Sequence, residues 1–355
     1  ADTTAGPKVA GVFNFAKVTT NVPNTINFIE VELDHCYNNV GTTGAYYLCS
    51  FAMCHLNFVG CNFHDNGVVG TQKIGGMFVN ATDTVFVPNT NVYGGSFTNT
   101  WNGVDNGDGG VFYFASAATT GVTSTAYIEG AYWGNNFCKK GGAFWVGQNT
   151  SADVVRCTFA DNAAYGYGGG AIGRGGNAYM ATELGYMRVV SSQFVRNSAI
   201  GGGSGGAIFD VNLNGRLEIE HCDFEDNYST TMGNTLYAQD RGASTTAQKP
   251  TLRNSRIYGD YSQGDGAHIT GESGDGRWQV YDLIIEGGIK AISDAAGLYS
   301  NVYDANLDRY LRAMRTATGM TIGADFQSRT PTWANYDAAG TKWRTQPSIG
   351  RYQSK

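Results

Sequence analysis

The chain has 355 residues, of which 50 are glycine and only 15% are charged. Its 42% of apolar residues and net charge of −6 exclude a disordered chain, which needs low hydrophobicity and high net charge, and give no basic footprint for nucleic acid. No apolar run approaches the 18 or more residues that a membrane-spanning helix requires. We therefore expect a glycine-rich, all-β protein with no membrane span and no nucleic-acid partner.

The first segment, residues 1–27, lacks the pattern that dominates the rest of the chain. Solenoid folds need capped ends, because an open terminal coil exposes sheet edges to other chains. We expect residues 1–27 to form an N-terminal cap.

Residues 28–292 contain two alternating strings. In the first, a small residue or cysteine is followed two positions later by an aromatic residue and five positions later by asparagine. It occurs at 61–66, 157–162, 192–197 and 222–227, with weaker copies that include 34–39 and 95–100. The second string, two glycines before two apolar residues, occurs at 109–112, 141–144, 169–172 and 205–208. Short β-type segments recurring about every 30 residues predict a parallel β-helix of about nine coils.

Equivalent residues of successive coils should lie above one another in such a fold. Phe63, Phe159, Phe194 and Phe224 are expected to share an internal column, and Asn66, Asn162, Asn197 and Asn227 to line one corner. Asparagine tolerates left-handed backbone geometry, and its amide can bond the equivalent amide of the next coil. The repeats thus predict an aromatic stack beside an asparagine ladder.

Together the two strings resemble the polymorphic outer-membrane-protein repeat, in which a GGAI string is paired with an FxxN string. Both are intact at 169–172 with 159–162, and at 205–208 with 194–197. The resemblance implies a right-handed parallel β-helix of the kind found in surface adhesins and autotransporter passengers. It indicates architecture more than activity, because pectate-lyase-like enzymes and phage tailspikes use the same solenoid.

After the repeats, residues 293–355 are expected to form a C-terminal cap. Leu307, Tyr310, Leu311 and Met314 are spaced by three and four residues, which predicts a short amphipathic helix over about 303–316. An irregular tail follows.

The longer loops after the glycine-pair strands should project from one side of the rod and form a groove. As catalytic candidates they hold Arg174, Asp210, Asp240 and Arg241, and as substrate-binding candidates Trp145, Tyr179, Glu183 and Arg277. Function concentrates on loops held by a rigid scaffold, and aromatic rings with planar polar neighbours suit a sugar. The alternative interpretation is ordinary loop decoration.

No metal site or cofactor is expected from the spacing of the histidines and cysteines. The segment 105–108 is similar to part of a calcium loop but lacks the distal glutamate of an EF-hand. Calcium would enter only with a lyase mechanism.

Two classes of function remain open. The first is a structural or adhesion protein that is extracellular, on a cell surface or on a virion surface, with a glycan surface as partner and with self-association or assembly with other surface proteins. The alternative is a polysaccharide lyase or glycoside hydrolase acting in the groove. Carboxylates, or Lys and Arg with calcium, converging in one groove would favour the enzyme.

Overall fold

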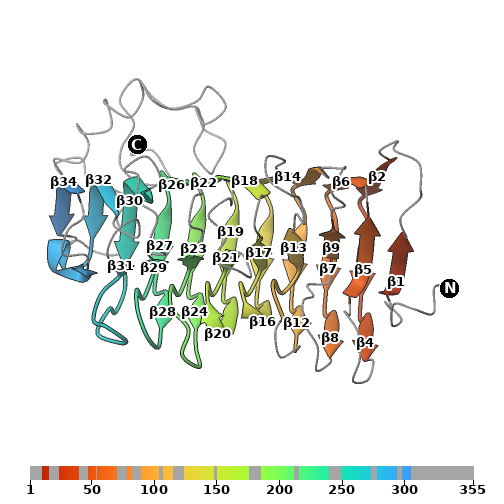
Figure 1. Ribbon diagram of the computed structural model, residues 1–355, viewed down its shortest axis with the longest axis horizontal. Coiled ribbons are helices and arrows are strands. Elements are labelled where there is room, and N and C mark those ends of the chain that lie inside the picture. Colours follow the sequence, from red (N-terminus) through yellow and green to blue (C-terminus); the bar gives the residue numbers. More distant parts are fainter. Residues whose placement is uncertain are drawn as a thin grey trace.

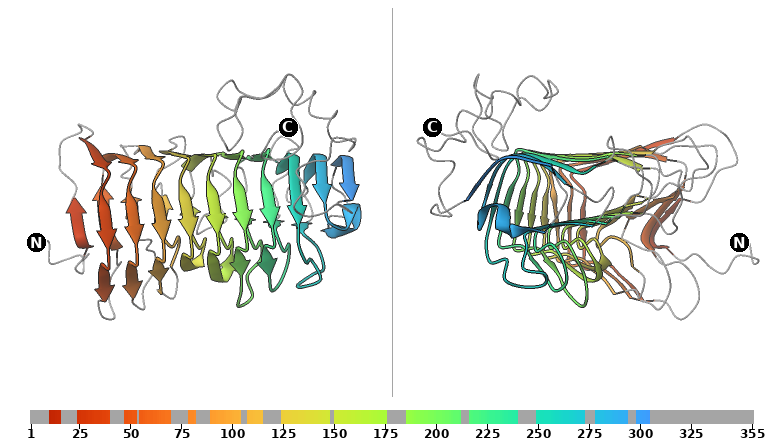
Figure 2. Two further views of the ribbon diagram at one scale, coloured as in Figure 1. Left: turned by 180° about the vertical axis from the view of Figure 1, so that it is seen from behind. Right: turned by 60° about the vertical axis from the view of Figure 1, so that its left-hand side comes forward.

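The fold is a rod of stacked coils, seen from the side in Figure 1 and from behind and obliquely in the two views of Figure 2. The computed structural model describes residues 10–15, 24–39, 47–52, 54–69, 78–81, 89–103, 107–114, 124–147, 150–175, 185–211, 216–239, 249–272, 278–293 and 298–304. These residues form three parallel sheets of 10, 17 and 7 strands that run the length of the rod.

The ten-stranded sheet, here sheet A, includes the four strands that follow the glycine pairs of 109–112, 141–144, 169–172 and 205–208. In spatial order the strands of sheet A are β1 (Ala10–Phe15), β5 (Tyr47–Ala52), β9 (Phe78–Ala81), β13 (Phe112–Phe114), β17 (Phe144–Val146), β21 (Ile172–Arg174), β25 (Ile208–Asp210), β29 (Leu236–Ala238), β31 (Ile269–Gly271) and β33 (Ile292–Ser293). Each strand pairs in parallel with its counterpart one coil further on.

The 17-stranded sheet, sheet B, consists of two rows that merge near the C-terminal end. The first row is β2 (Asn24–Ile29), β6 (Cys54–Val59), β10 (Asn89–Tyr93), β14 (Ser124–Glu129), β18 (Thr150–Val155), β22 (Met187–Val190), β26 (Leu217–Glu220), β30 (Thr251–Tyr258), β32 (Gln279–Ile285) and β34 (Leu298–Asp304). The second is β3 (Glu32–Asp34), β7 (Asn62–His64), β11 (Ser96–Thr98), β15 (Tyr132–Gly134), β19 (Thr158–Ala160), β23 (Gln193–Val195) and β27 (Asp223–Glu225). The rows join because β30 pairs with both β26 and β27.

The seven-stranded sheet, sheet C, lies between sheets B and A along each coil. It comprises β4 (Tyr37–Asn39), β8 (Gly67–Val69), β12 (Trp101–Asn102), β16 (Phe137–Lys140), β20 (Ala163–Gly168), β24 (Ser198–Ala199) and β28 (Tyr228–Ser229). A single turn of 3-10 helix, η3 (Gly288–Ala291), precedes β33. Within the described ranges, no helix is long and apolar enough to cross a membrane.

The predicted all-β parallel solenoid is confirmed, but its details differ. The number of coils differs from the expected nine: among the described residues, sheet A has ten strands and sheet C has seven. Strands occur on both sides of the predicted limits of 28 and 292, since β1 and the start of β2 precede the first and β34 follows the second. Of the predicted helix over 303–316, residues 303 and 304 belong to β34, and the rest lies outside the described residues.

The interior of sheet B contains the predicted aromatic column. Register pairs connect Leu33, Phe63, Phe97, Trp133, Phe159, Phe194, Phe224 and Ile257 in successive coils. The rings of Phe159 and Phe194 stack at 4.7 Å between centroids, and those of Phe194 and Phe224 at 4.9 Å. These buried aromatic rings supply much of the apolar surface removed from water in the core.

The predicted asparagine ladder is also present at the bend that follows this column. The Nδ2 atoms of Asn136, Asn162 and Asn197 each donate to Oδ1 of the next asparagine at 2.9–3.0 Å, and the ladder ends at Asn227. The left-handed residue, however, is the one before each asparagine, for example Asp161 with φ 58°. The asparagine side chain is inside the bend satisfying buried backbone groups, so the preceding residue makes the turn.

Each glycine of a pair is required for a different structural reason. The first glycine of each pair adopts a left-handed backbone, as Gly169 does at φ 71°. The second allows the coils to approach closely, because a Cβ on Gly170 would lie 2.1 Å from the carbonyl oxygen of Gly206. Together they allow the coils to stack at about the 4.8 Å spacing of paired strands.

The weak copy of the first string assigned to residues 34–39 is wrong by three residues. Leu33 pairs with Phe63, and Tyr37 pairs with Gly67. The equivalent of 61–66 is therefore 31–36, where leucine and cysteine replace the aromatic residue and the asparagine.

Candidate functional site

Arg174 and Asp210, which were predicted to lie in the loops of the groove, are the last residues of two strands of sheet A. The two residues are register partners on β21 and β25. Arg174 has no exposed surface, and its Nε and Nη2 atoms donate to the two carboxylate oxygens of Asp210 at 2.8 and 2.9 Å. Arg174 Nη1 also donates to the carbonyl of Arg216 at 3.0 Å. This geometry is that of a buried ion pair that fastens one coil to the next.

Trp145, predicted to bind substrate, is buried on β17. It packs with Phe209, Val211 and Tyr237, and its Nε1 donates to the carbonyl of Gly175 at 3.0 Å. Its ring therefore belongs to a small hydrophobic cluster on sheet A. The other predicted site residues, Tyr179, Glu183, Asp240, Arg241 and Arg277, lie outside the described residues.

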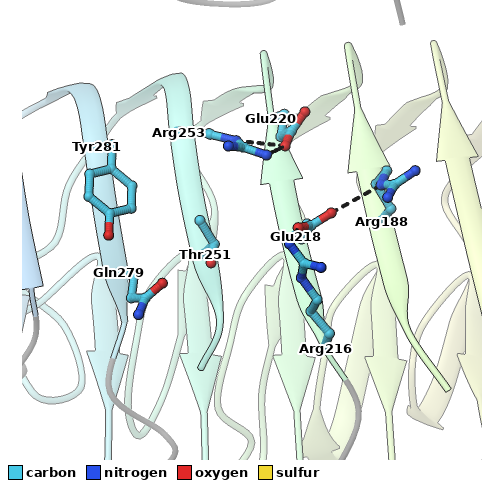
Figure 3. A pocket seen from close by; sticks show the side chains of 8 residues that line it. All are labelled: Arg188, Arg216, Glu218, Glu220, Thr251, Arg253, Gln279 and Tyr281. Atoms are coloured by element: carbon cyan, nitrogen blue, oxygen red, sulfur yellow. Dashed lines mark hydrogen bonds and ion pairs between the residues drawn. The ribbon is translucent and has the colours of Figure 1, made fainter. Parts of the chain in front are cut away.

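A different groove lies on the outer face of sheet B (Figure 3), with a volume of about 340 Å³. Its lining comes from four successive coils. The lining residues are Arg188, Arg216, Glu218, Glu220, Thr251, Arg253, Gln279 and Tyr281. All of these side chains are polar or charged, and Tyr281 contributes the one aromatic ring among them.

Strand alternation places these side chains on the outside. On β26, Leu217 and Ile219 belong to the core, so Glu218 and Glu220 point to the opposite face. Parallel register then aligns Glu218 with Arg188 on one side and with Thr251 on the other. The neighbouring column aligns Glu220, Arg253 and Tyr281 in the same way.

Ion pairs order the charged part of the groove. Glu218 accepts from Nε of Arg188 at 3.1 Å and also contacts Arg216. Nε of Arg253 donates to Oε1 of Glu220 at 2.6 Å. Figure 3 shows the Glu218–Arg188 and Glu220–Arg253 pairs side by side on adjoining columns.

The two glutamates differ in their surroundings. Burial raises the pKa of the Glu220 carboxyl, although the Arg253 guanidinium acts in the opposite direction. Its Oε2 atom is buried and has no hydrogen-bond partner among the described residues. Glu220 therefore retains a proton to higher pH than an exposed glutamate does.

The buried cysteines offer no nucleophile to this groove. Burial raises the pKa of Cys157 to about 11 and that of Cys138 to about 12, so both stay protonated near neutral pH. Both thiols are in the interior of the rod, consistent with cysteine as a small core residue.

The groove residues were absent from the sequence predictions. The signal was the Leu-Glu-Ile-Glu alternation at 217–220, together with an arginine at the matching positions of the coils before and after it. The match between the glutamates and the arginines can be recognised only when the register between coils is known.

One group of described residues combines metal-ligating side chains. Ligand atoms of Asp34, His64 and Asp65 all lie within 4.8 Å of one another. The sequence spacing had predicted no metal site, because these residues belong to two different coils.

Comparison with known proteins found no match: no family model, no curated protein and no solved structure corresponds to this chain. The likeness to the outer-membrane-protein repeat therefore consists of the shared strings alone.

Proposed function

We propose that this chain is a structural or adhesion protein of an extracellular, cell or virion surface, and that it binds a glycan in the outer groove of sheet B. The observation that carries the proposal is the groove itself, a polar channel crossing four coils of a rigid rod. Coils about 4.8 Å apart present repeated hydrogen-bonding groups, which suits an elongated ligand laid across the strands.

The chemistry of the lining supports a hydroxyl-rich ligand. The guanidinium, carboxylate and amide groups are planar and offer paired donors or acceptors. The hydroxyl of Thr251 and the ring of Tyr281 add a short polar group and a face against which a pyranose can pack. Pockets with a few fixed polar groups are typical of specific small-ligand recognition.

The GGAI and FxxN strings support the surface assignment. We propose that the chain belongs to the same kind of repeat as the polymorphic outer-membrane proteins, as a passenger-like rod. The terminal strands of sheet A, β1 and β33, each have an edge with no strand beyond it among the described residues, which supports self-association or assembly with other surface proteins.

The test is binding of the full chain to a panel of neutral and uronic-acid-containing oligosaccharides, measured by calorimetry. Gln279→Ala and Tyr281→Ala each remove one groove contact and should weaken binding about tenfold, the equivalent of one hydrogen bond. Tyr132→Ala is the matched control, because Tyr132 is exposed on the same sheet but outside the groove. Absence of binding to every glycan, or an equal loss in the control, would refute the proposal.

A glycoside hydrolase is the second candidate, favoured by the presence of two carboxyl groups, Glu218 and Glu220, in one groove. Hydrolases need one protonated carboxylic acid beside an ionised carboxylate, and Glu220 is the group whose pKa burial raises. Release of reducing ends from a bound glycan, lost in Glu220→Gln while binding persists, would establish the enzyme. Binding without product would leave the adhesion function.

A further inference from the structure

Two aspartates and two histidines on neighbouring coils form a square in which the two residue types alternate. Asp34 and His35 stand on one coil, and His64 and Asp65 on the next. Asp34 and His64 are register partners on β3 and β7. His35 and Asp65 follow them, and both have a left-handed backbone, with φ of 50° and 54°. Each aspartate thus lies beside a histidine both along and across the coils.

The imidazole of His64 is the centre of this square. Its Nδ1 atom lies 3.2 Å from Oδ1 of Asp34 and 2.9 Å from Oδ2 of Asp65. The same Oδ1 of Asp34 contacts Nδ1 of His35. A small tetrahedral ion with ligands at about 2.1 Å separates its ligand atoms by about 3.4 Å. The observed separations are already close to this value.

A carboxylate stands behind the imidazole. Nε2 of His64 lies 3.2 Å from Oε1 of Glu32, on the side of the ring away from the two aspartates. A histidine that binds a metal through one nitrogen usually donates its other N–H to a carboxylate or carbonyl, which fixes the ring and its tautomer. Glu32 occupies that position.

The turn itself does not require this set. In the next coil the positions of His64 and Asp65 are taken by Thr98 and Asn99, and in the coil after that by Gly134 and Asn135. Aspartate recurs at the position of Asp65 in two later coils, as Asp161 and Asp226, but no histidine precedes it there. This combination occurs only where the first two copies of the bend meet, within the part of the rod that the structure describes.

We propose that Asp34, His64 and Asp65 bind a divalent transition-metal ion of the zinc type, with Glu32 orienting His64. An imidazole with two carboxylates suits zinc and its neighbours in the first transition row. Calcium and magnesium prefer a shell made of oxygen atoms alone, and calcium takes six to eight of them. The site stands apart from the glycan groove and does not depend on it.

The experiment titrates the full chain with Zn²⁺ by calorimetry and with Co²⁺ by visible absorption, whose intensity reports tetrahedral coordination. We expect one ion per chain. His64→Thr and Asp65→Asn should abolish binding, and both should fold, because threonine and asparagine occupy these positions in the next coil. Asp161→Asn is the matched control, since Asp161 has the same place in its bend, and should bind as the wild type does.

Glu32→Gln separates the orienting role from direct ligation. This variant should still bind one ion, with affinity lower by about 10- to 100-fold, as expected for loss of an outer carboxylate. The proposal is overturned if neither ion binds, if His64→Thr and Asp65→Asn bind as well as Asp161→Asn, or if Ca²⁺ or Mg²⁺ binds more tightly than Zn²⁺.

Discussion

The two faces of sheet B follow different rules. On the inner face, the same kind of residue recurs from coil to coil, as in the aromatic column from Phe63 to Phe224. On the outer face, one column changes from Tyr127 to Asp153, Arg188 and Glu218 in successive coils. Stacking favours repetition along the whole inner column, whereas on the outer face repetition is limited to short rows such as Asn27, Asn57 and Asn91. Residues that depart from the repeat on the outer face are therefore the first candidates for function.

The largest loss of stability is expected on removal of one partner of the buried ion pair between Arg174 and Asp210. Arg174→Ala would leave the buried Asp210 carboxylate without its bidentate partner, and should lower the free energy of unfolding by about 3–5 kcal/mol. Denaturant unfolding monitored by circular dichroism measures it. A loss below 1 kcal/mol would show that the pair does not fasten the coils, and would restore Arg174 as a candidate for direct chemistry.

A second effect concerns pH and the buried His268. Burial lowers the pKa of His268 to about 4, against about 6.5 in the unfolded chain. Between these values the unfolded state binds a proton that the folded state does not, so stability falls as pH decreases from 7 to 4. The loss is on the order of 3 kcal/mol. Unfolding curves across this range should show it, and His268→Gln should reduce the slope; an equal slope in that variant would contradict the assignment.

Asparagine side chains hydrogen-bond to one another on both faces, so the same substitution can be compared inside and outside. Asn162→Ala removes an acceptor from Asn136 and a donor to Asn197 inside the bend, and should cost about 2 kcal/mol. Asn57→Ala breaks a similar amide chain on the outer face, where Asn57 donates to Asn27, and should cost less than about 1 kcal/mol. Equal costs in thermal unfolding would remove the distinction between inside and outside.

The smallest effect is expected for an exposed counterpart of the Arg174–Asp210 pair. Arg196 donates to both oxygens of Asp161 at 2.7 and 2.8 Å, but both side chains are exposed. Arg196→Ala should change the free energy of unfolding by less than about 1 kcal/mol. A loss as large as that of Arg174→Ala would mean that geometry, and not burial, sets the strength of these pairs.

The inner face was predictable from the sequence because repetition is visible there. The strings placed Phe159, Phe194 and Asn162 in their columns without any knowledge of coordinates. Assigning the left-handed backbone to the asparagine was wrong, because the string identifies the bend and does not show which residue makes it. Arg174 and Asp210 were expected in loops, since a charged residue just after a glycine pair gives no indication that its partner lies one coil away.

The outer face was harder to predict because its contacts join residues about 30 positions apart. An error of three residues in the first coil placed Asp34 against Cys61 when its partner is His64. That displacement concealed the square of aspartates and histidines. The glutamates of β26 were visible in the sequence as part of an alternating segment. Identifying their arginine partners required the register of β26 with β22 and β30.

The inner asparagine ladder joins each of its coils to the coil before and the coil after. Asn136, Asn162 and Asn197 each donate one Nδ2 hydrogen to the asparagine of the next coil and the other to a backbone carbonyl of the preceding coil. Asn227 donates to the carbonyl of Phe194 in the preceding coil. On the outer face, Asn57 and Asn91 each donate to the asparagine of the preceding coil. Aligned amides polarise one another and strengthen the chain that they form. The bend at Asn162 or Asn197 therefore cannot be displaced without breaking side-chain hydrogen bonds to both neighbouring coils.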